Sequence, residues 1–330
     1  MAGFYFTLER IDDGFSGGTA LRFSGGRGVL PDYRRYTGVE RDALREFLAE
    51  HGRQARGFFV DFGGGSAAEK RGPLIFNPES RLIEKLLAAG LLRNAGGEPL
   101  GAANGFFRCA LKLSQRDGAS VKASLALEDE SGGIIEGDGK SSNLTVYGAS
   151  FAVVGNLVYR IDDMGHRWTE TAFLNTVIQK PELSSFLSLV FSRFTGIPLL
   201  YEGWVVRKAR SAQALPALLF MEIDRYGYLH IRPIAYLQNF PPLFLENEEI
   251  VSAVNIDEAE KTIGVSEIVF PEDSGGLLRS LLFKRDKTAK NMLHEENGRF
   301  ILAPDFAKKF FAENIIELTR RFVLLQTAVL

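Results

Sequence analysis

The feature that most constrains the fold is a succession of short apolar runs with a period of two, which begins near Phe106. Phe107, Cys109, Leu111 and Leu113 alternate with polar or small residues. This alternation is typical of β-strands, and similar short runs follow at residues 121–127, 144–147, 151–154 and 157–161. Parallel neighbours need long, usually helical crossovers, whereas these strands cluster without alternating helices. We therefore expect an α+β fold with mainly antiparallel sheets, packed helices and two or more subdomains.

The clearest local signal is a β-hairpin. The apolar runs 218–223 and 228–232 lie on either side of Asp224-Arg225-Tyr226-Gly227, a connection that contains a glycine. A second pair of runs, 250–256 and 261–270, is joined by the acidic loop Asp257-Glu258-Ala259-Glu260. Both pairs favour antiparallel neighbours.

Helical spacing of apolar residues predicts helices at 39–51, 78–89 and 182–194, and a closing helix from Pro304 to about Phe322. The second of these has Pro78 in its first turn and Gly90 just past its end, as helices often do.

A length of 330 residues favours more than one packed subdomain. We place a Gly-rich N-terminal α+β subdomain at 1–100 and a mixed strand and helix accessory domain at 101–330. The closing helix is expected to lead into a downstream segment, because the apolar run 322–330 at the end of the sequence needs a partner to cover it.

Composition indicates a cytoplasmic protein. The single cysteine, Cys109, excludes an internal disulfide and fits a reducing compartment; we expect it to be a buried core thiol. The N-terminus has no signal-peptide pattern, and no window approaches the roughly 20 apolar residues of a membrane span. We expect no membrane partner.

Two motifs resemble catalytic ones only in part. Gly139-Lys140-Ser141 follows Gly133 with five intervening residues, one more than a phosphate-binding loop has, and a strand-like segment comes next where a helix is required. Asp138-Gly139-Lys140 has the order of a nuclease triplet, but glycines flank it, which indicates a flexible loop that cannot preorganise a metal site.

Other chemistry-bearing residues are equally incomplete. Glu222 and Asp224 could share a strand face as paired carboxylates, or lie at a solvated strand end. The four histidines are scattered without the spacing of zinc ligands, and no Gly-x-Ser-x-Gly element occurs. We therefore expect no catalytic residue, no metal and no cofactor in this chain.

Charge is distributed in blocks, although the net charge is only −2. Residues 246–273 are strongly acidic, and a basic block follows that we take as the only dense cationic cluster. These opposed blocks could be solvated faces or a docking surface for a charged partner. The candidate contacts to nucleic acid or a partner are Lys284, Arg285, Lys287 and Lys290.

Several stretches resemble the region N-terminal to the ATPase core in bacterial Swi/Snf-type helicase-like proteins of superfamily two. The likeness runs from about residue 75 to the end of the sequence and lies in structural patterns, not catalytic ones. It is carried by residues 106–111, 182–189, 216–234, 265–270 and 304–322.

The resemblance implies a non-catalytic accessory or regulatory module of an ATP-dependent DNA translocase. Its partners would be the downstream ATPase core in cis, which would hold ATP and Mg, and double-stranded DNA. Two alternatives remain from the residues themselves. One is a free-standing protein-interaction module of a bacterial regulatory or defence system, and the other is a cryptic nuclease built on Asp138 and Lys140.

Overall fold

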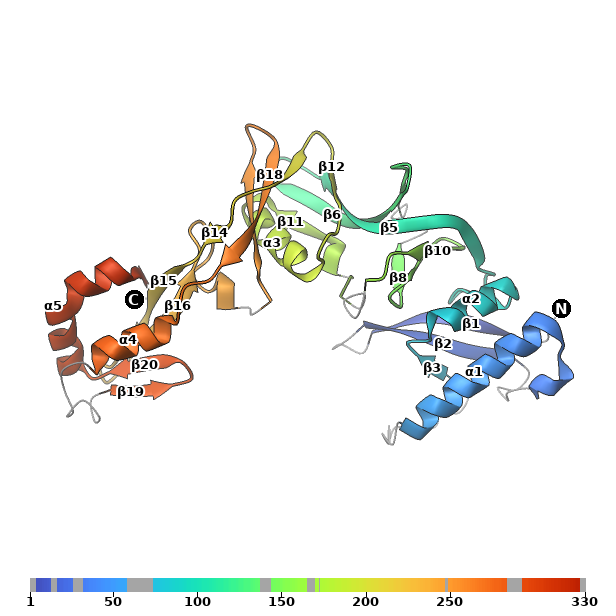
Figure 1. Cartoon of the computed structure of the whole chain (residues 1–330), viewed down its shortest axis with the longest axis horizontal. Helices are drawn as coiled ribbons and strands as arrows, with labels where there is room; N and C mark the ends of the chain where they lie inside the picture. Colours follow the sequence, from blue (N-terminus) through green and yellow to red (C-terminus); the bar gives the residue numbers. More distant parts are fainter. Residues whose placement is uncertain are drawn as a thin grey trace. The chain divides into compact units, whose positions relative to one another are not determined.

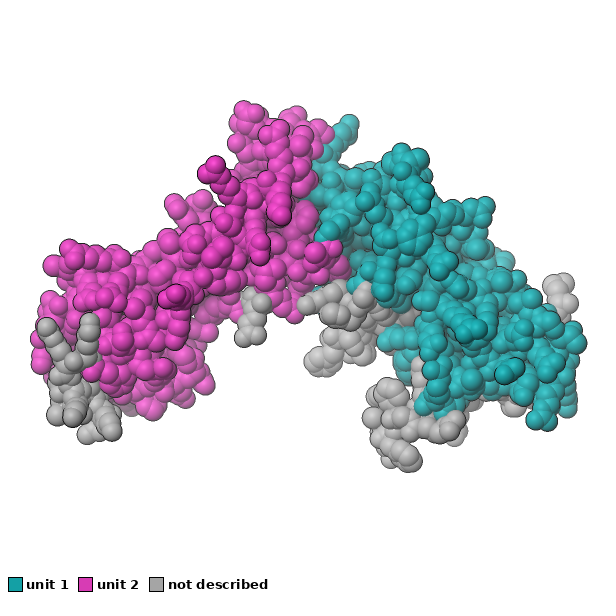
Figure 2. Space-filling view, viewed as in Figure 1, with its two compact units in different colours: residues 1–179, 196–202 teal, residues 180–195, 203–330 magenta. Residues whose placement is uncertain are grey.

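The computed structural model divides the chain into two compact units, which are coloured separately in Figure 2. The first consists of residues 1–179 and 196–202, and the second of residues 180–195 and 203–330. The structure describes residues 4–12, 17–25, 32–57, 74–136, 144–164, 170–171, 173–246, 249–283 and 293–326. The expected α+β class with mainly antiparallel sheets is confirmed.

The boundary that we placed at residue 100 falls inside the first unit. The physical reason is a shared hydrophobic core. Phe151, Val153 and Val158 pack into the same buried cluster as Phe6 and Phe47, so the N-terminal hundred residues do not close a core by themselves.

The first sheet of the first unit has the order β3-β2-β1-β4. Its neighbours are antiparallel except β1 and β4, which run parallel. Strands β1, β2 and β3 are labelled in Figure 1. The strands are β1 (Phe4–Asp12), β2 (Gly17–Gly25), β3 (Leu74–Phe76) and β4 (Leu92–Arg93). Helices α1 (Gly38–Gly57) and α2 (Ser80–Ala88) pack on it, close to the expected helices 39–51 and 78–89.

Aromatic side chains fill the space between this sheet and α1. The alternation along β1 directs Phe4 and Phe6 to one face, where the Phe6 ring lies 4.7 Å from Phe47 and 5.5 Å from Phe23 between centroids. Phe6, Phe23 and Phe47 are at most 2% exposed. Burying side chains of this size contributes about 1.5–3 kcal/mol each.

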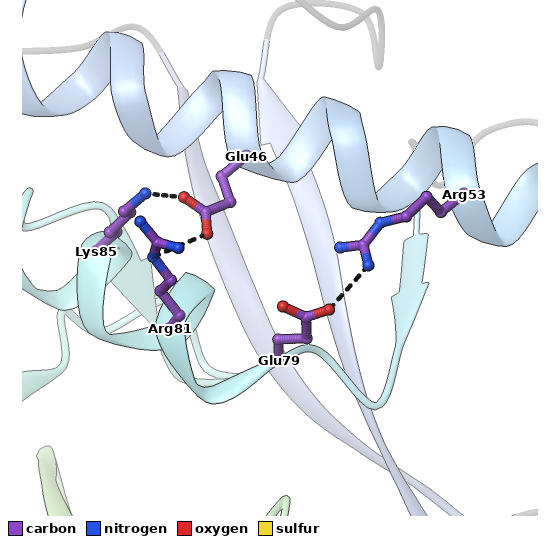
Figure 3. Close-up of polar contacts among 5 residues, drawn as sticks. All are labelled: Glu46, Arg53, Glu79, Arg81 and Lys85. Atoms are coloured by element: carbon purple, nitrogen blue, oxygen red, sulfur yellow. Dashed lines mark hydrogen bonds and ion pairs between the residues drawn. The ribbon is translucent and has the colours of Figure 1, made fainter.

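Ion pairs join α1 to α2 at the rim of that core (Figure 3). Glu46 on α1 contacts Lys85 and lies 3.6 Å from Arg81, both on α2. Further along α1, Arg53 Nη1 lies 2.9 Å from Glu79 Oε1, just before the start of α2. These pairs are partly exposed, so each contributes little, but together they align the two helices.

The second sheet of the first unit is built on the long hairpin of β5 (Gly101–Gln115) and β6 (Ser120–Asp129). The strand order is β11-β6-β5-β10-β9-β8, with β12 also beside β5 and β7 beside β6. The remaining strands are β7 (Ile134–Glu136), β8 (Thr145–Tyr147), β9 (Phe151–Val154), β10 (Leu157–Ile161), β11 (Thr176–Gln179) and β12 (Leu199–Tyr201).

The first α-helix of the second unit is α3 (Leu183–Arg193), as the spacing of 182–194 predicts. It packs beside a sheet in which β18 lies between β17 on one side and β13 and β14 on the other. The strands are β13 (Val205–Lys208), β14 (Ala212–Gln213), β17 (Ser252–Asp257) and β18 (Thr262–Val269). The expected hairpin of 250–256 with 261–270 is confirmed as β17 and β18.

A five-stranded sheet of order β19-β20-β16-β15-β21 forms the rest of this unit. The expected hairpin at 218–232 is confirmed as β15 (Leu215–Ile223) and β16 (Leu229–Tyr236). Helices α4 (Ser274–Leu282) and α5 (Pro304–Arg321) bury Leu278 and Phe310 against one face of it. The other strands are β19 (Leu293–Glu296), β20 (Arg299–Leu302) and β21 (Val323–Gln326).

The expectation that the apolar run after the closing helix lacks a cover needs correction. Val323–Gln326 does not form an uncovered tail, because it pairs in parallel with β15 as strand β21. Its three apolar side chains are half-buried, and Leu324 packs on the core under α4 and α5. The rest of the apolar run, 327–330, lies outside the described residues.

Candidate nucleic-acid interface

The four predicted contact residues, Lys284, Arg285, Lys287 and Lys290, lie outside the described residues. The structure fixes only what flanks them: α4 ends at Leu282, and β19 begins at Leu293. Asp138 and Lys140, the residues of the nuclease alternative, also lie outside the described part of the chain.

Several acids of the block at residues 246–273 are engaged within their own unit. Glu246 lies 2.8 Å from Arg232, and Glu249 lies 2.8 Å from Arg193. The carboxylate of Asp257 accepts two backbone N–H groups of the turn between β17 and β18, and Asp273 caps the N-terminus of α4. Several of these acids therefore stabilise local structure, which weakens the interpretation of the block as a single docking surface.

The paired carboxylates that the sequence suggested at Glu222 and Asp224 do not form a described pair. The Glu222 side chain lies outside the described residues, and Asp224 is committed to the β15–β16 turn. Asp224 Oδ2 also lies 3.6 Å from His230 Nε2. Among the described residues, no group of three or more histidines, cysteines or carboxylates is placed to hold a metal ion.

Cys109 is buried, as expected, with 7% of its surface exposed. Burial, together with the nearby charge of Asp162, raises the pKa of the Cys109 thiol to about 12. The nucleophilic thiolate is therefore not populated at neutral pH, and this residue belongs to the core.

Among the described residues, the two edges of the sheet around β18 differ in whether their outward backbone groups have hydrogen-bond partners. On the β17 edge, the hydroxyl of Ser188 on α3 accepts the N–H of Val254 at 2.8 Å. Ser192 Oγ accepts the N–H groups of Val251 and Ser252 at 3.0 and 2.9 Å. Each hydroxyl donates its own proton to a carbonyl one turn earlier in α3. The helix thus satisfies the backbone groups that an edge strand leaves free.

The opposite edge, β13, is open among the described residues. Val205 N donates to Lys261 O at 3.0 Å and Ala209 N donates to Val265 O at 2.8 Å. Both residues therefore face β18. Because successive residues of a strand point their backbone groups to opposite sides, the N–H and C=O groups of Val206 and Lys208 point away from the sheet. All residues from Val205 to Ser211 are exposed.

This open edge carries three cations, Arg207, Lys208 and Arg210, which we call the basic edge. In the described part of the chain, none of these side chains has an ion-pair or hydrogen-bond partner. Arg207 pairs in register with Gly264 and Lys208 with Val265, so the two side chains point to opposite faces of the sheet. The edge is thus positively charged on both faces.

The basic edge was not predicted from the sequence, and the expectation that residues 284–290 form the only dense cationic cluster needs correction. The available signal was three cations at residues 207–210, directly after the apolar pair Val205-Val206. It was missed because the segment has no alternation that predicts a strand. The strand forms because β18, which is distant in the sequence, supplies a parallel partner.

No protein-family model matches this sequence, and no curated protein is significantly similar to it. None of the helices in the described ranges combines the length and apolar character that a membrane span requires.

Proposed function

We propose that this chain is a non-catalytic accessory module of an ATP-dependent DNA translocase, and that the basic edge contacts DNA phosphates. The observation that carries the proposal is the open strand edge with three exposed cations that no described carboxylate neutralises. Arginine and lysine are the residues that most often bind phosphate oxygens. An accessory module of this kind would hold or position DNA while a motor in cis supplies ATP and Mg chemistry.

The geometry of the basic edge suits a phosphate backbone. Extended chain rises about 3.3 Å per residue, so Arg207 to Arg210 span roughly 10 Å. B-DNA carries one phosphate charge per strand for about every 3.4 Å of helix axis, so an edge of this length lies against neighbouring phosphates of the duplex. Side chains on both faces of the edge can reach phosphates without a groove. Such contacts position DNA without reading its sequence.

The test is duplex binding measured by fluorescence anisotropy at about 0.1 M salt. The variant Arg207→Ala/Lys208→Ala/Arg210→Ala is expected to bind a duplex of about 20 base pairs at least about 100-fold more weakly. Each lost phosphate contact removes about 0.9 log unit at that salt concentration. Two duplexes of unrelated sequence are expected to bind the wild type equally.

The matched control is Arg45→Ala/Lys308→Ala/Lys309→Ala, which removes three exposed cations from α1 and α5. Both triple variants change the formal net charge from −2 to −5, since each loses three positive charges. The control is expected to bind within about twofold of the wild type. Wild-type protein that binds no duplex, or a basic-edge variant that binds as well as the control, would refute the proposal.

A second candidate function is supported by the outward backbone groups of Val206 and Lys208. An open edge of this kind accepts an extended peptide as an added strand, and its cations would favour an acidic one. The variant Val206→Pro separates the two functions. It removes the outward N–H that an added strand requires, but leaves every cation of the basic edge in place. Duplex binding that survives Val206→Pro supports DNA contact, whereas binding of an acidic peptide that this variant abolishes supports strand addition.

A further inference from the structure

The turn of the β15–β16 hairpin presents an exposed cluster of aromatic and cationic side chains. Tyr226 is 67% exposed, Tyr228 is 38% exposed and the neighbouring Ile223 is 58% exposed. The guanidinium of Arg225 lies 4.7 Å from the centroid of the Tyr226 ring. We call Arg225, Tyr226 and Tyr228 the aromatic tip. Large apolar groups left this exposed contribute little to the stability of the fold.

Hydrogen bonds hold the backbone of the aromatic tip in one conformation. The Asp224 carboxylate accepts the N–H groups of Tyr226 and Tyr228, both at 2.9 Å. Gly227 N donates to Asp224 O at 2.9 Å, and Asp224 N donates to Tyr228 O at 3.0 Å. Burial by itself raises the pKa of Asp224, but these N–H groups and His230 together hold it below the usual value. The carboxylate therefore stays ionised and keeps its two acceptor bonds at neutral pH.

The turn also packs closely on the start of α5. Gly227 has a φ of +83°, which a side chain rarely tolerates, and a Cβ at this position would lie 3.1 Å from Pro304 Cγ at the start of α5. The backbone of the tip thus rests directly on a helix terminus. Because the turn is fixed before any ligand arrives, binding through its side chains loses little backbone entropy.

The chemistry of the exposed groups identifies their ligand. A tyrosine ring offers two flat faces for stacking, and the guanidinium of Arg225 lies over one face of Tyr226, so a base would stack on the opposite face. Arg225 forms no ion pair with any described residue, so its charge is available. Stacking faces next to an unneutralised cation match a nucleotide, which has a planar base and a phosphate. Paired bases inside a duplex do not expose these faces.

We infer that the aromatic tip stacks on unpaired nucleobases, so that the DNA bound by this chain includes a single-stranded segment. This inference rests on the proposed DNA-binding function but not on the same residues. It adds that the basic edge contacts phosphates while the aromatic tip recognises that bases are exposed.

The test compares two probes with the same number of phosphates. One is a thymidine oligonucleotide of about 15 nucleotides, and the other is an abasic strand of the same length, within the usual range of single-strand sites. The wild type is expected to bind the thymidine strand about 5- to 150-fold more tightly for each stacked base, which corresponds to about 1–3 kcal/mol. The variant Tyr226→Ala/Tyr228→Ala is expected to bind both strands equally.

Tyr226→Phe/Tyr228→Phe is the conservative control, because phenylalanine keeps the stacking face and loses only the hydroxyl. It is expected to retain the preference for the thymidine strand. The inference that the aromatic tip stacks on bases is overturned if the wild type binds both strands equally, or if the alanine variant keeps the preference for the thymidine strand. In either case the duplex result with the basic-edge variant still decides the proposed function. Wild-type protein that binds neither strand nor the duplex refutes both proposals.

Discussion

At the scale of single residues, Glu50 is the most unusual group in the described structure. It is the only carboxylate, amine or guanidinium among the buried residues described there, with 4% of its surface exposed. Its Oε1 accepts the N–H of Glu79 at 3.2 Å, at the N-terminus of α2, whereas Oε2 has no hydrogen-bond partner among the described residues. Burial, opposed in part by this hydrogen bond, raises the pKa of Glu50.

The raised pKa predicts how stability depends on pH. The folded state favours the protonated carboxyl, so the contribution of Glu50 is fully present below its unfolded-state pKa and is lost as the pH rises through its folded-state pKa. We therefore expect Glu50→Gln to be more stable than the wild type at about pH 7, and the difference to shrink toward the usual carboxyl pKa of about 4. Urea unfolding between about pH 4 and pH 7 measures this difference in the free energy of unfolding. Asp42→Asn, at an exposed position of α1, is the control for one lost charge. A difference that does not change with pH would contradict the account.

The position of Glu50 on the buried side of α1 can be predicted from the sequence. Ala43, Leu44, Phe47 and Glu50 are all buried and recur at helical spacing on α1, so the pattern by itself places a carboxylate on the apolar side. The partner could not be predicted, because the N–H of Glu79 is 29 residues away and reaches Glu50 only after α2 has packed on α1. Local spacing identifies a face but not what covers it.

At the scale of elements, the sheet around β18 shows what local patterns can and cannot predict. The antiparallel pair β17 and β18 follows from two runs joined by a short turn. The parallel pairing of β13 and β14 with β18 has no turn to fix its register and depends on contacts between distant segments. The contacts of the α3 serines with β17 also depend on distant segments. The i, i+4 spacing of Ser188 and Ser192 is visible in the sequence, but the sequence does not show which strand donates N–H groups to them.

Ser188 is expected to stabilise this element measurably. It is fully buried, and Ser188→Ala would leave the Val254 N–H without an acceptor. An unsatisfied buried donor costs about 1–3 kcal/mol, so the free energy of unfolding should fall by that amount. Ser280→Ala, at an exposed position of α4, serves as the comparison and should change stability by less than about 0.5 kcal/mol. Equal stability of the two variants would show that the β17 edge does not need α3.

At the scale of the whole molecule, net charge conceals how charge is placed. The total of −2 gives no long-range attraction to DNA. The structure nonetheless separates acids that serve turns, caps and ion pairs from the cations of the basic edge, which have no such role in the described residues. Composition could not reveal this separation, because it depends on which strand lies at the edge of a sheet.

The most direct test of the central claim is the salt dependence of duplex binding between about 50 and 200 mM salt. Phosphate contacts release counterions, so the logarithm of the binding constant falls with the logarithm of salt by about 0.9 per contact. Removing Arg207, Lys208 and Arg210 together is expected to make this slope shallower by roughly 2.7, from three contacts at about 0.9 each. The control that removes Arg45, Lys308 and Lys309 should keep the wild-type slope. Equal slopes for the wild type and the basic-edge variant would contradict the assignment of this edge as the DNA contact.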